Sequence, residues 1–176
     1  MHKPECGSSS KSFAMRPIGL VQTPYVRSQG TPIQGASSGS GEGVVEIFPE
    51  FAPGLLDLQG FERLWLICLL DRAAAPRMVV RPYLEDKEHG VFATRAPSRP
   101  NPIGLTSVRL LGIDGNRLRI ADVDMLDGTP LLDIKPYLPA FDCFPVVRTG
   151  WYRSLSAAGA VADDRFEARN PDSHES

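Results

Sequence analysis

Alternating apolar and polar residues mark several short strands along the chain. Val45 and Ile47 alternate with the polar Glu46, which is the pattern of a half-buried strand. Arg63 to Leu70 is instead almost continuously apolar and bounded by charge, which predicts a central strand covered on both faces. Further strands are predicted at residues 16–22, 78–84, 106–113 and 116–125. The pattern therefore predicts a mainly β fold.

Turn and breaker residues define how these strands are joined. Asp114-Gly115 predicts a tight hairpin between the strands at 106–113 and 116–125. Val123 and Met125 continue in the opposite phase to the start of the second strand, which predicts a β-bulge near Ala121. One short helix is predicted at residues 49–59, where apolar residues follow helical spacing before Gly60.

The most unusual stretch is the proline-rich segment from Gly90 to Leu105. Three prolines within six residues fix the backbone, so they hold Arg95, Arg99 and Asn101 in place with little entropy left to lose on binding. A rigid loop with these side chains is typical of a ligand platform. The alternative interpretation is a connection that only reverses the chain. The residues themselves do not decide between a ligand loop and a connection.

Composition agrees with one globular domain. The chain has 176 residues, of which 42% are hydrophobic and 23% charged. Its 16 prolines and 16 glycines favour a turn-rich β architecture over a helical bundle. No apolar run reaches the ~20 residues that span a bilayer, and the polar start has no secretory signal, so a cytoplasmic protein without a membrane partner is expected. We predict a disordered leader at 1–14, a domain at 15–160 and a disordered acidic tail at 161–176.

Metal and nucleophile chemistry are not supported by the sequence. The three cysteines and three histidines are scattered, with no CxxC pair. Four aspartates fall within twelve residues, but their strand alternation favours solvated rims over a metal site; they are Asp122, Asp124, Asp127 and Asp133. No GxGxxG or GxxxxGK[ST] fingerprint is present. The residues alone thus predict a β protein with ligand loops and do not name a reaction.

Two long motifs resemble a known family. GVFATRAPSRPNPIG, followed about twenty residues later by DMLDGTPLLDIKPYLP, closely resembles the TsaA/TrmO-like family, and RPIGLVQTPY and GFERLWLICLL match its opening and central strands. The resemblance covers roughly residues 16–140. It implies a single-sheeted β-barrel with small helical additions, and a homodimer.

The resemblance also implies an activity and a site. Family members transfer a methyl group from S-adenosyl-L-methionine to N6 of threonylcarbamoyladenosine at tRNA position 37, so the expected partner is a tRNA anticodon stem-loop. The implied cofactor contacts are Pro32, Ile33, Gln34, Asp71, Arg72, Arg95, Leu105, Met125, Leu126, Asp127 and Gly128. Arginine suits the carboxylate of the cofactor and aspartate its ammonium group.

The catalytic residues are hypotheses. Methyl transfer needs positioning and an acceptor for the proton of the nitrogen. Asn101-Pro102 is the proposed acceptor and Asp127 the alternative, although Asn101 could simply cap the turn.

The chain also departs from the family pattern. Many members have Arg where it has Ile33 and His-Gln where it has Asp71-Arg72, and longer members carry a further C-terminal domain. A methyltransferase for another small substrate, or a non-catalytic module that binds S-adenosylmethionine or a nucleotide, are the alternative functions.

Overall fold

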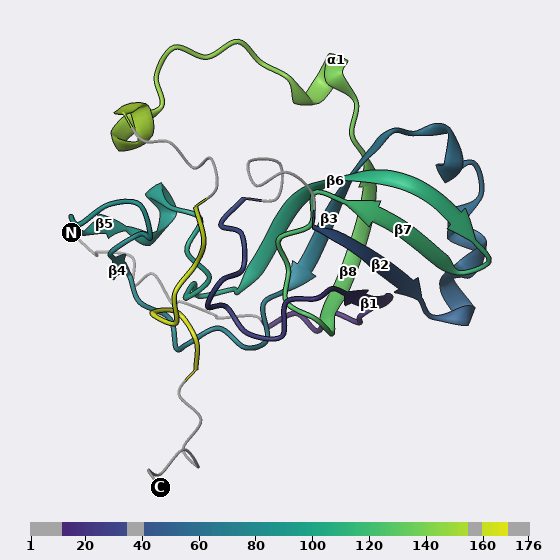
Figure 1. Ribbon diagram of the computed structural model, residues 1–176, viewed down its shortest axis with the longest axis horizontal. Helices are drawn as coiled ribbons and strands as arrows, with labels where there is room; N and C mark the ends of the chain where they lie inside the picture. Colours follow the sequence, from purple (N-terminus) through teal and green to yellow (C-terminus); the bar gives the residue numbers. More distant parts are fainter. Residues whose placement is uncertain (1–11, 35–40, 155–159, 169–176) are drawn as a thin grey trace, which may run out of the picture.

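Six antiparallel strands close into a single barrel. The computed structural model describes residues 12–34, 41–154 and 160–168. Around the barrel the strands follow the order β1-β2-β7-β6-β3-β8, and β8 pairs with β1 to close it (Figure 1). Their bounds are β1 Gly19–Gln22, β2 Glu42–Ile47, β3 Arg63–Leu69, β6 Ile103–Asp114, β7 Arg117–Ala121 and β8 Thr129–Pro136. The predicted mainly β, single-sheeted barrel is confirmed.

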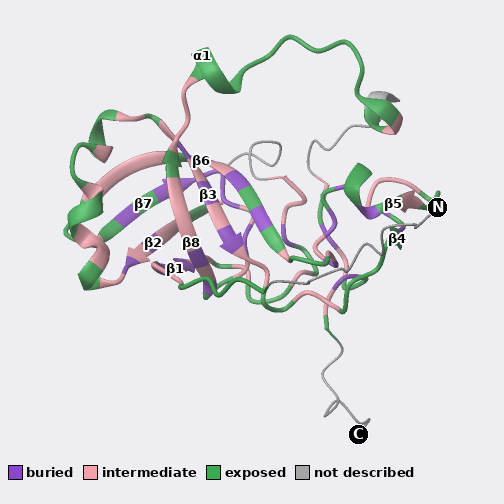
Figure 2. Ribbon diagram, turned by 180° about the vertical axis from the view of Figure 1, so that it is seen from behind, coloured by how far each residue is buried: buried purple, intermediate pink, exposed green. Residues whose placement is uncertain are grey.

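The inward side chains of the six strands form the core. Leu64, Leu66 and Cys68 point inward from β3 and are fully buried, as expected for every second residue of a strand. The outer face of β3 is only half buried, so the prediction that both faces are covered was wrong (Figure 2). A closed barrel of this size covers each strand on the inside alone. Trp65 on the outer face packs against Tyr137 instead, with ring centroids 5.5 Å apart.

The hairpin between β6 and β7 turns at the predicted residues. Gly115 has φ +57°, a conformation that glycine adopts without strain. The predicted bulge near Ala121 is absent, because β7 ends at Ala121 and Asp122 takes φ +65°. The register shifts instead lie between Leu110 and Gly112 of β6 and within β3. Ending β7 there lets the carboxylate of the buried Asp122 pair with Arg63.

Other predicted elements are shorter than expected. The helix predicted at 49–59 forms two 3₁₀ helices, η2 Pro49–Leu55 and η3 Leu58–Gly60, because Pro53 cannot donate to a longer helix. The strand predicted at 78–84 is only β4 Val79–Val80, which pairs with β5 His89–Gly90. The remaining elements are η4 Val91–Ala93, α1 Pro139–Asp142 and η5 Gly150–Ser154. None of the helices in the described ranges could cross a membrane.

The chain leaves the barrel after β8 and returns to it as a strap. Residues 139–150 form an exposed arm that arches from α1 to the β4–β5 lobe (Figures 1 and 2). Residues 160–168, which we call the strap, then run between this lobe and the barrel (Figure 1). The tail was expected to be disordered from 161 on, yet the strap is held by bridges of Val161 to Pro32 and of Glu167 to Ala73. Residues 1–11 of the predicted leader and 169–176 of the tail lie outside the described residues.

The thiol of Cys68 lies in the core of the barrel. Burial in the barrel raises the pKa of Cys68 to about 12, so this thiol is a core residue and remains protonated at neutral pH. Within the described ranges, no group of three or more His, Cys, Asp or Glu side chains could hold a metal ion.

Candidate functional site

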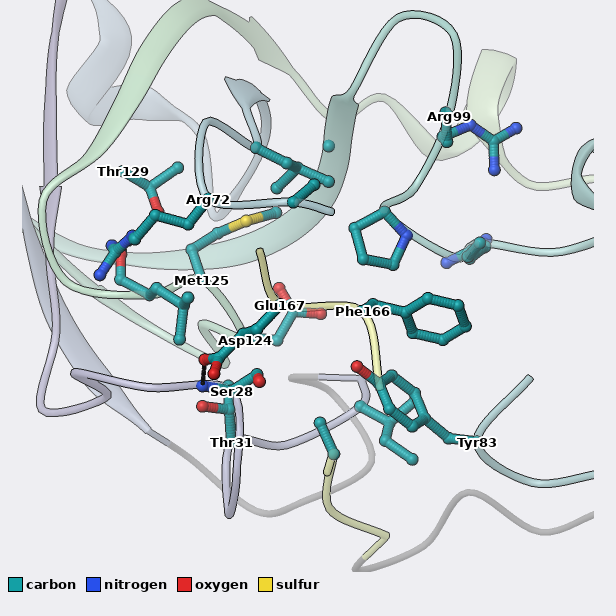
Figure 3. Close-up of a pocket in the computed structure, with 18 of the residues that line it drawn as sticks. Ser28, Thr31, Arg72, Tyr83, Arg99, Asp124, Met125, Thr129, Phe166 and Glu167 are labelled. Carbon is teal, nitrogen blue, oxygen red and sulfur yellow. Dashed lines mark hydrogen bonds between the residues drawn. The ribbon is translucent and has the colours of Figure 1, made fainter. Parts of the chain in front are cut away.

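A cavity of about 370 Å³ lies where the barrel, the proline-rich loop and the strap meet. Its walls come from the loop after β1, the end of β3, the start of β6, the segment before β8 and the strap. Figure 3 shows Arg72 and Thr129 on one side of it and Tyr83 and Phe166 on the other, with Asp124 and Met125 between them. The volume falls within the range of small-molecule sites.

Most of the residues implied by the family resemblance line this one cavity. Nine of the eleven do so: Pro32, Ile33, Gln34, Asp71, Arg72, Arg95, Leu105, Met125 and Leu126. Asp127 and Gly128 are not among the lining residues and sit in the turn behind Leu126. The fold therefore brings together four segments that are far apart in the sequence.

The proline-rich loop is held rigid by one of its own arginines. Arg99 Nη1 donates to the carbonyl oxygens of Val91, Thr94 and Ala96 at 3.2, 2.9 and 3.3 Å. The guanidinium group thus replaces the backbone donors that the prolines lack. Because the loop is fixed from within, Arg95 can point to the cavity, where its Nη1 donates to Gln34 Oε1 at 2.8 Å.

Arg72 is a structural tie between two walls. It donates through Nη2 to the carbonyl oxygen of Asp127 and through Nη1 to that of Val26 at 3.4 Å. The Asp127 carboxylate in turn accepts a hydrogen bond from the backbone N–H of Thr23 at 3.0 Å. Arg72 and Asp127 therefore fasten the loop after β1 to the turn before β8, and they shape the cavity from behind.

The floor of the cavity depends on a residue without a side chain. Gly104 in β6 lines it, and a Cβ atom there would lie 2.9 Å from Leu70 Cδ2 and 3.1 Å from Met125 Cε. Both distances are shorter than ordinary van der Waals contact. A larger residue would push Leu70 or Met125 into the cavity, so glycine keeps this space open.

Acidic and hydroxyl groups give the cavity its polar character. Asp71, Asp124 and Glu167 line it together with Ser28. Glu167 Oε1 accepts a hydrogen bond from the Ser28 N–H at 2.5 Å (Figure 3). The Ser28 hydroxyl is buried, and among the described residues it has no hydrogen-bond partner. A buried hydroxyl of this kind is costly unless a ligand group or water satisfies it.

Sequence reasoning missed the wall formed by the strap. Phe166 packs edge-on against Tyr83, with ring centroids 5.1 Å apart, and burial in this contact raises the pKa of Tyr83. Arg165 hydrogen-bonds the carboxylate of Asp163 and holds its pKa below the ordinary value. The available signal was Phe166 itself, a lone aromatic residue within a run of charged residues.

Replacing Phe166 by alanine should release the strap. Phe166 is 4% exposed and, with Tyr83, belongs to a small apolar cluster away from the barrel core. Without the ring, little apolar contact opposes local opening, so trypsin should cut after Arg165 at least about tenfold faster. The rate of this cut is measured by mass spectrometry under native conditions.

Val161→Ala is the matched control. Val161 lies on the same strap but is 56% exposed, so its side chain contributes little packing. It should leave the cleavage rate within about twofold of the unmodified chain. Equal cleavage rates for the two variants would show that the Phe166 ring does not hold the strap.

The three residues hypothesised to accept a proton, Asn101, Pro102 and Asp127, lie outside the cavity wall. The carbonyl of Asn101 accepts from Ile103 N–H at 2.7 Å, and that of Pro102 accepts from Leu70 N–H at 2.7 Å. The third candidate, Asp127, is bonded to Thr23. These carbonyls thus shape the turn into β6, while the carboxylates on the cavity wall are those of Asp71, Asp124 and Glu167.

Known proteins share this fold and its motifs. Residues 20–143 match the family model of the tRNA-methyltransferase O N-terminal domain. A probable S-adenosyl-L-methionine-binding protein of Pyrococcus abyssi is 53% identical over 136 residues, which cover 77% of this chain and 74% of the relative. A tRNA (adenine(37)-N6)-methyltransferase of Escherichia coli is 32% identical over 157 residues, which cover 84% of this chain and 67% of the relative.

Structural comparison gives the same result. The crystal structure of TrmO from Pseudomonas aeruginosa superposes with a TM-score of 0.68 at 34% sequence identity. The match covers 80% of this chain but 63% of the TrmO chain, so the chain spans under two thirds of that relative's length. The matched family model covers both long motifs and all six barrel strands except the first residue of β1. The chain therefore belongs to the family of the tRNA-methyltransferase O N-terminal domain.

Proposed function

We propose that this protein methylates N6 of threonylcarbamoyladenosine at position 37 of tRNA, with S-adenosyl-L-methionine as the methyl donor. The observation that carries the proposal is the single cavity that unites nine of the residues implied by the family motifs. Relatives include proteins named S-adenosyl-L-methionine-binding proteins, a putative S-adenosylmethionine-dependent methyltransferase and a tRNA (adenine(37)-N6)-methyltransferase. A tRNA substrate would place the reaction in the cytoplasm.

The cavity fits the proposed methyl donor in charge and in polarity. S-adenosyl-L-methionine supplies an electrophilic methyl group on a positively charged sulfonium. Among the three arginines of the wall, Arg72 and Arg99 are engaged with backbone carbonyls, whereas Arg95 contacts only the Gln34 side chain in the described contacts. Arg95 is therefore the guanidinium group best placed to bind a carboxylate.

Acidic residues complement the positive groups of this ligand. Asp71 at the end of β3 is exposed and lines the cavity, so it can pair with an ammonium group. Asp124 lies beside Met125 in the middle of the cavity, where a negative charge stabilises a sulfonium (Figure 3). The buried Ser28 hydroxyl provides a hydrogen-bonding group that a polar ligand would satisfy.

The contribution of the protein to methyl transfer is mainly positioning. As the bond from the methyl group to N6 forms and its bond to sulfur breaks, the N6 proton has to leave. We keep Asn101 and Asp127 as candidate groups for this step, acting through the turns that they fix beside the cavity. Neither lines the cavity wall, so the carboxylates that do, those of Asp71, Asp124 and Glu167, are the alternative proton acceptors.

Mass spectrometry of tRNA nucleosides tests the proposal. Incubating tRNA that carries threonylcarbamoyladenosine with the protein and S-adenosyl-L-methionine should yield the N6-methylated nucleoside, heavier by one CH2 unit because the methyl group replaces the N6 hydrogen. The product should be absent without the methyl donor. A deletion strain whose tRNA lacks the methylated nucleoside should regain it when the strain expresses this chain, which would show the same reaction in cells.

Calorimetry with S-adenosyl-L-methionine separates this proposal from its alternatives. Binding without any methylated nucleoside would support a non-catalytic binding module. Binding with methylation of a different small substrate would support the other methyltransferase reading, for which the apolar Ile33 in the wall is one reason. No binding would contradict all three.

A homodimer is part of the proposal. The arm exposes large apolar side chains at residues 141, 144, 146 and 147, each at least 69% exposed in one chain. A second copy would cover this surface, because exposed apolar stretches of this length are uncommon in monomers.

A further inference from the structure

A second cavity lies directly beside the first. Its volume is about 560 Å³, and its walls come from the β4–β5 lobe, the proline-rich loop and the segment around η5. The two cavities share six wall residues: Ile33, Gln34, Tyr83, Thr94, Arg95 and Phe166. They are therefore adjacent, and their common wall includes the Arg95–Gln34 hydrogen bond and the Tyr83–Phe166 ring pair.

Trp151 forms a fixed aromatic wall of this second cavity. Its indole Nε1 donates to the carbonyl oxygen of Ala93 at 2.8 Å, which ties it to the start of the proline-rich loop. One face of the ring stacks on His89, with centroids 4.6 Å apart and planes inclined by 19°. The arm, which arches from α1 to the β4–β5 lobe (Figure 1), thus brings Trp151 onto β5.

Two other aromatic rings line the same space while remaining accessible. Phe92 is 72% exposed and Tyr152 is 39% exposed, and both line the cavity together with Tyr83. Core aromatics are buried, so rings exposed at this level around a cavity are available for stacking on a ligand. The Arg99 guanidinium lies 6.0 Å from the centroid of one of these rings, Phe92, and the Arg95 guanidinium lines the cavity.

We propose that this second cavity binds the unstacked adenine nucleotide of the RNA substrate, with Trp151 as its stacking platform. The inference rests on the proposed function, because it assumes that the first cavity holds the methyl donor. RNA-modifying enzymes reach a base by taking it out of the stack and holding it between aromatic side chains. Transfer also requires donor and acceptor to meet, which two cavities with a common wall allow.

Arg95 and Gln34 mark the point where the two ligands would meet. Both line both cavities, and the hydrogen bond between their side chains lies on the common wall. A base held on Trp151 would direct its exocyclic nitrogen to this common wall, where the bond from the methyl carbon to N6 forms and the carbon–sulfur bond breaks. The sulfur leaves as the neutral thioether of the spent donor, and the N6 proton passes to a carboxylate of the first cavity, Asp71, Asp124 or Glu167. The second cavity therefore supplies the acceptor side of the reaction.

Intrinsic fluorescence tests the binding step. The chain has two tryptophans, so Trp65→Phe leaves Trp151 as the sole reporter. Trp65 lies on the outer face of β3 beside Tyr137 and lines neither cavity, so this change should not disturb the site. Titration with an anticodon stem-loop RNA, and separately with adenosine monophosphate, should quench Trp151 fluorescence saturably, because a stacked base quenches indole emission.

Kinetics with two Trp151 variants test the role of the ring. With S-adenosyl-L-methionine saturating, Trp151→Ala should lower kcat/KM for RNA about tenfold to hundredfold, the effect of losing one stacked base. Trp151→Phe should restore most of the rate, and Trp65→Phe should match the unmodified chain. Calorimetric affinity for S-adenosyl-L-methionine should change less than about twofold in Trp151→Ala, which also reports that the variant is folded.

The outcomes separate this inference from the proposed function. Methylation by Trp151→Ala at the rate of Trp65→Phe would overturn the inference while the activity stands. Methylated RNA that never quenches Trp151 would also overturn it. If no RNA is methylated at all, the proposed function fails, but the titration still tests whether the second cavity binds a nucleotide. Quenching of Trp151 by the stem-loop RNA or by adenosine monophosphate would support a nucleotide site there. No quenching by either would contradict it.

Discussion

Leu66→Ala is expected to lower the free energy of unfolding by about 3 kcal/mol, a large loss for one side chain. Leu66 is fully buried in β3, where it pairs with Thr106 of β6 and Ile134 of β8. Its side chain points into the closed barrel, and a closed sheet cannot easily collapse around the cavity left behind. Urea unfolding should show a lower midpoint with an unchanged slope, and the melting temperature should fall by roughly 6–12 °C.

Leu56→Ala provides the control for this measurement. Leu56 follows η2 and is 82% exposed, so the same chemical change removes almost no buried surface. Its effect on the free energy of unfolding should stay within about 0.5 kcal/mol. A similar loss in both variants would mean that the barrel interior does not dominate the stability of the chain.

Arg95→Glu is expected to reduce kcat/KM for tRNA methylation by at least about hundredfold without affecting stability. Hydrogen bonds to charged groups contribute about 1.5–3 kcal/mol each, and reversing the charge adds repulsion of any bound carboxylate. Arg95 is exposed and lies on the wall shared by both cavities, so the change should weaken methyl-donor binding as well as the transfer step. Calorimetry and single-turnover kinetics would measure the two effects separately.

Two further variants complete this experiment. Arg95→Lys keeps the charge but not the planar fork of donors, so its loss should be intermediate, about tenfold. Arg119→Glu makes the same charge reversal at an exposed position of β7 that lines neither cavity, and its activity should stay unchanged. Activity of Arg95→Glu within about threefold of Arg119→Glu would exclude a role for Arg95 in the site.

Local patterns in the sequence account for much of the barrel. The strand at Val45 and Ile47 and the turn at Asp114-Gly115 form as predicted, and the apolar run at β3 forms the predicted strand although its outer face is only half buried. Strand and turn formation depend on neighbouring residues. The positions where prediction failed are set by distant contacts. Asp122 follows the end of β7 in a left-handed conformation, and its carboxylate pairs with Arg63, almost sixty residues earlier.

In the candidate site too, local sequence predicts some features and distant contacts decide the others. Arg95 and Gln34 could be selected from motifs, but nothing local in the chain shows that their side chains meet at 2.8 Å. Arg99 was expected to face a ligand along with Arg95, yet it mainly bonds the carbonyls of its own loop. The Arg99 guanidinium can donate either to carbonyls of its own loop or to a ligand, and only the folded loop decides which of these it does.

The sequence by itself determined the β character, the stiff proline-rich loop and the family of this protein, because each depends on residues close together in the chain. Only the tertiary structure decided that the strap closes the first cavity through Phe166 and Glu167, and that the arm carries Trp151 to the second. Both contacts join segments separated by more than fifty residues. Their free energy comes from burying surfaces that meet only in the folded chain, so no local pattern encodes them.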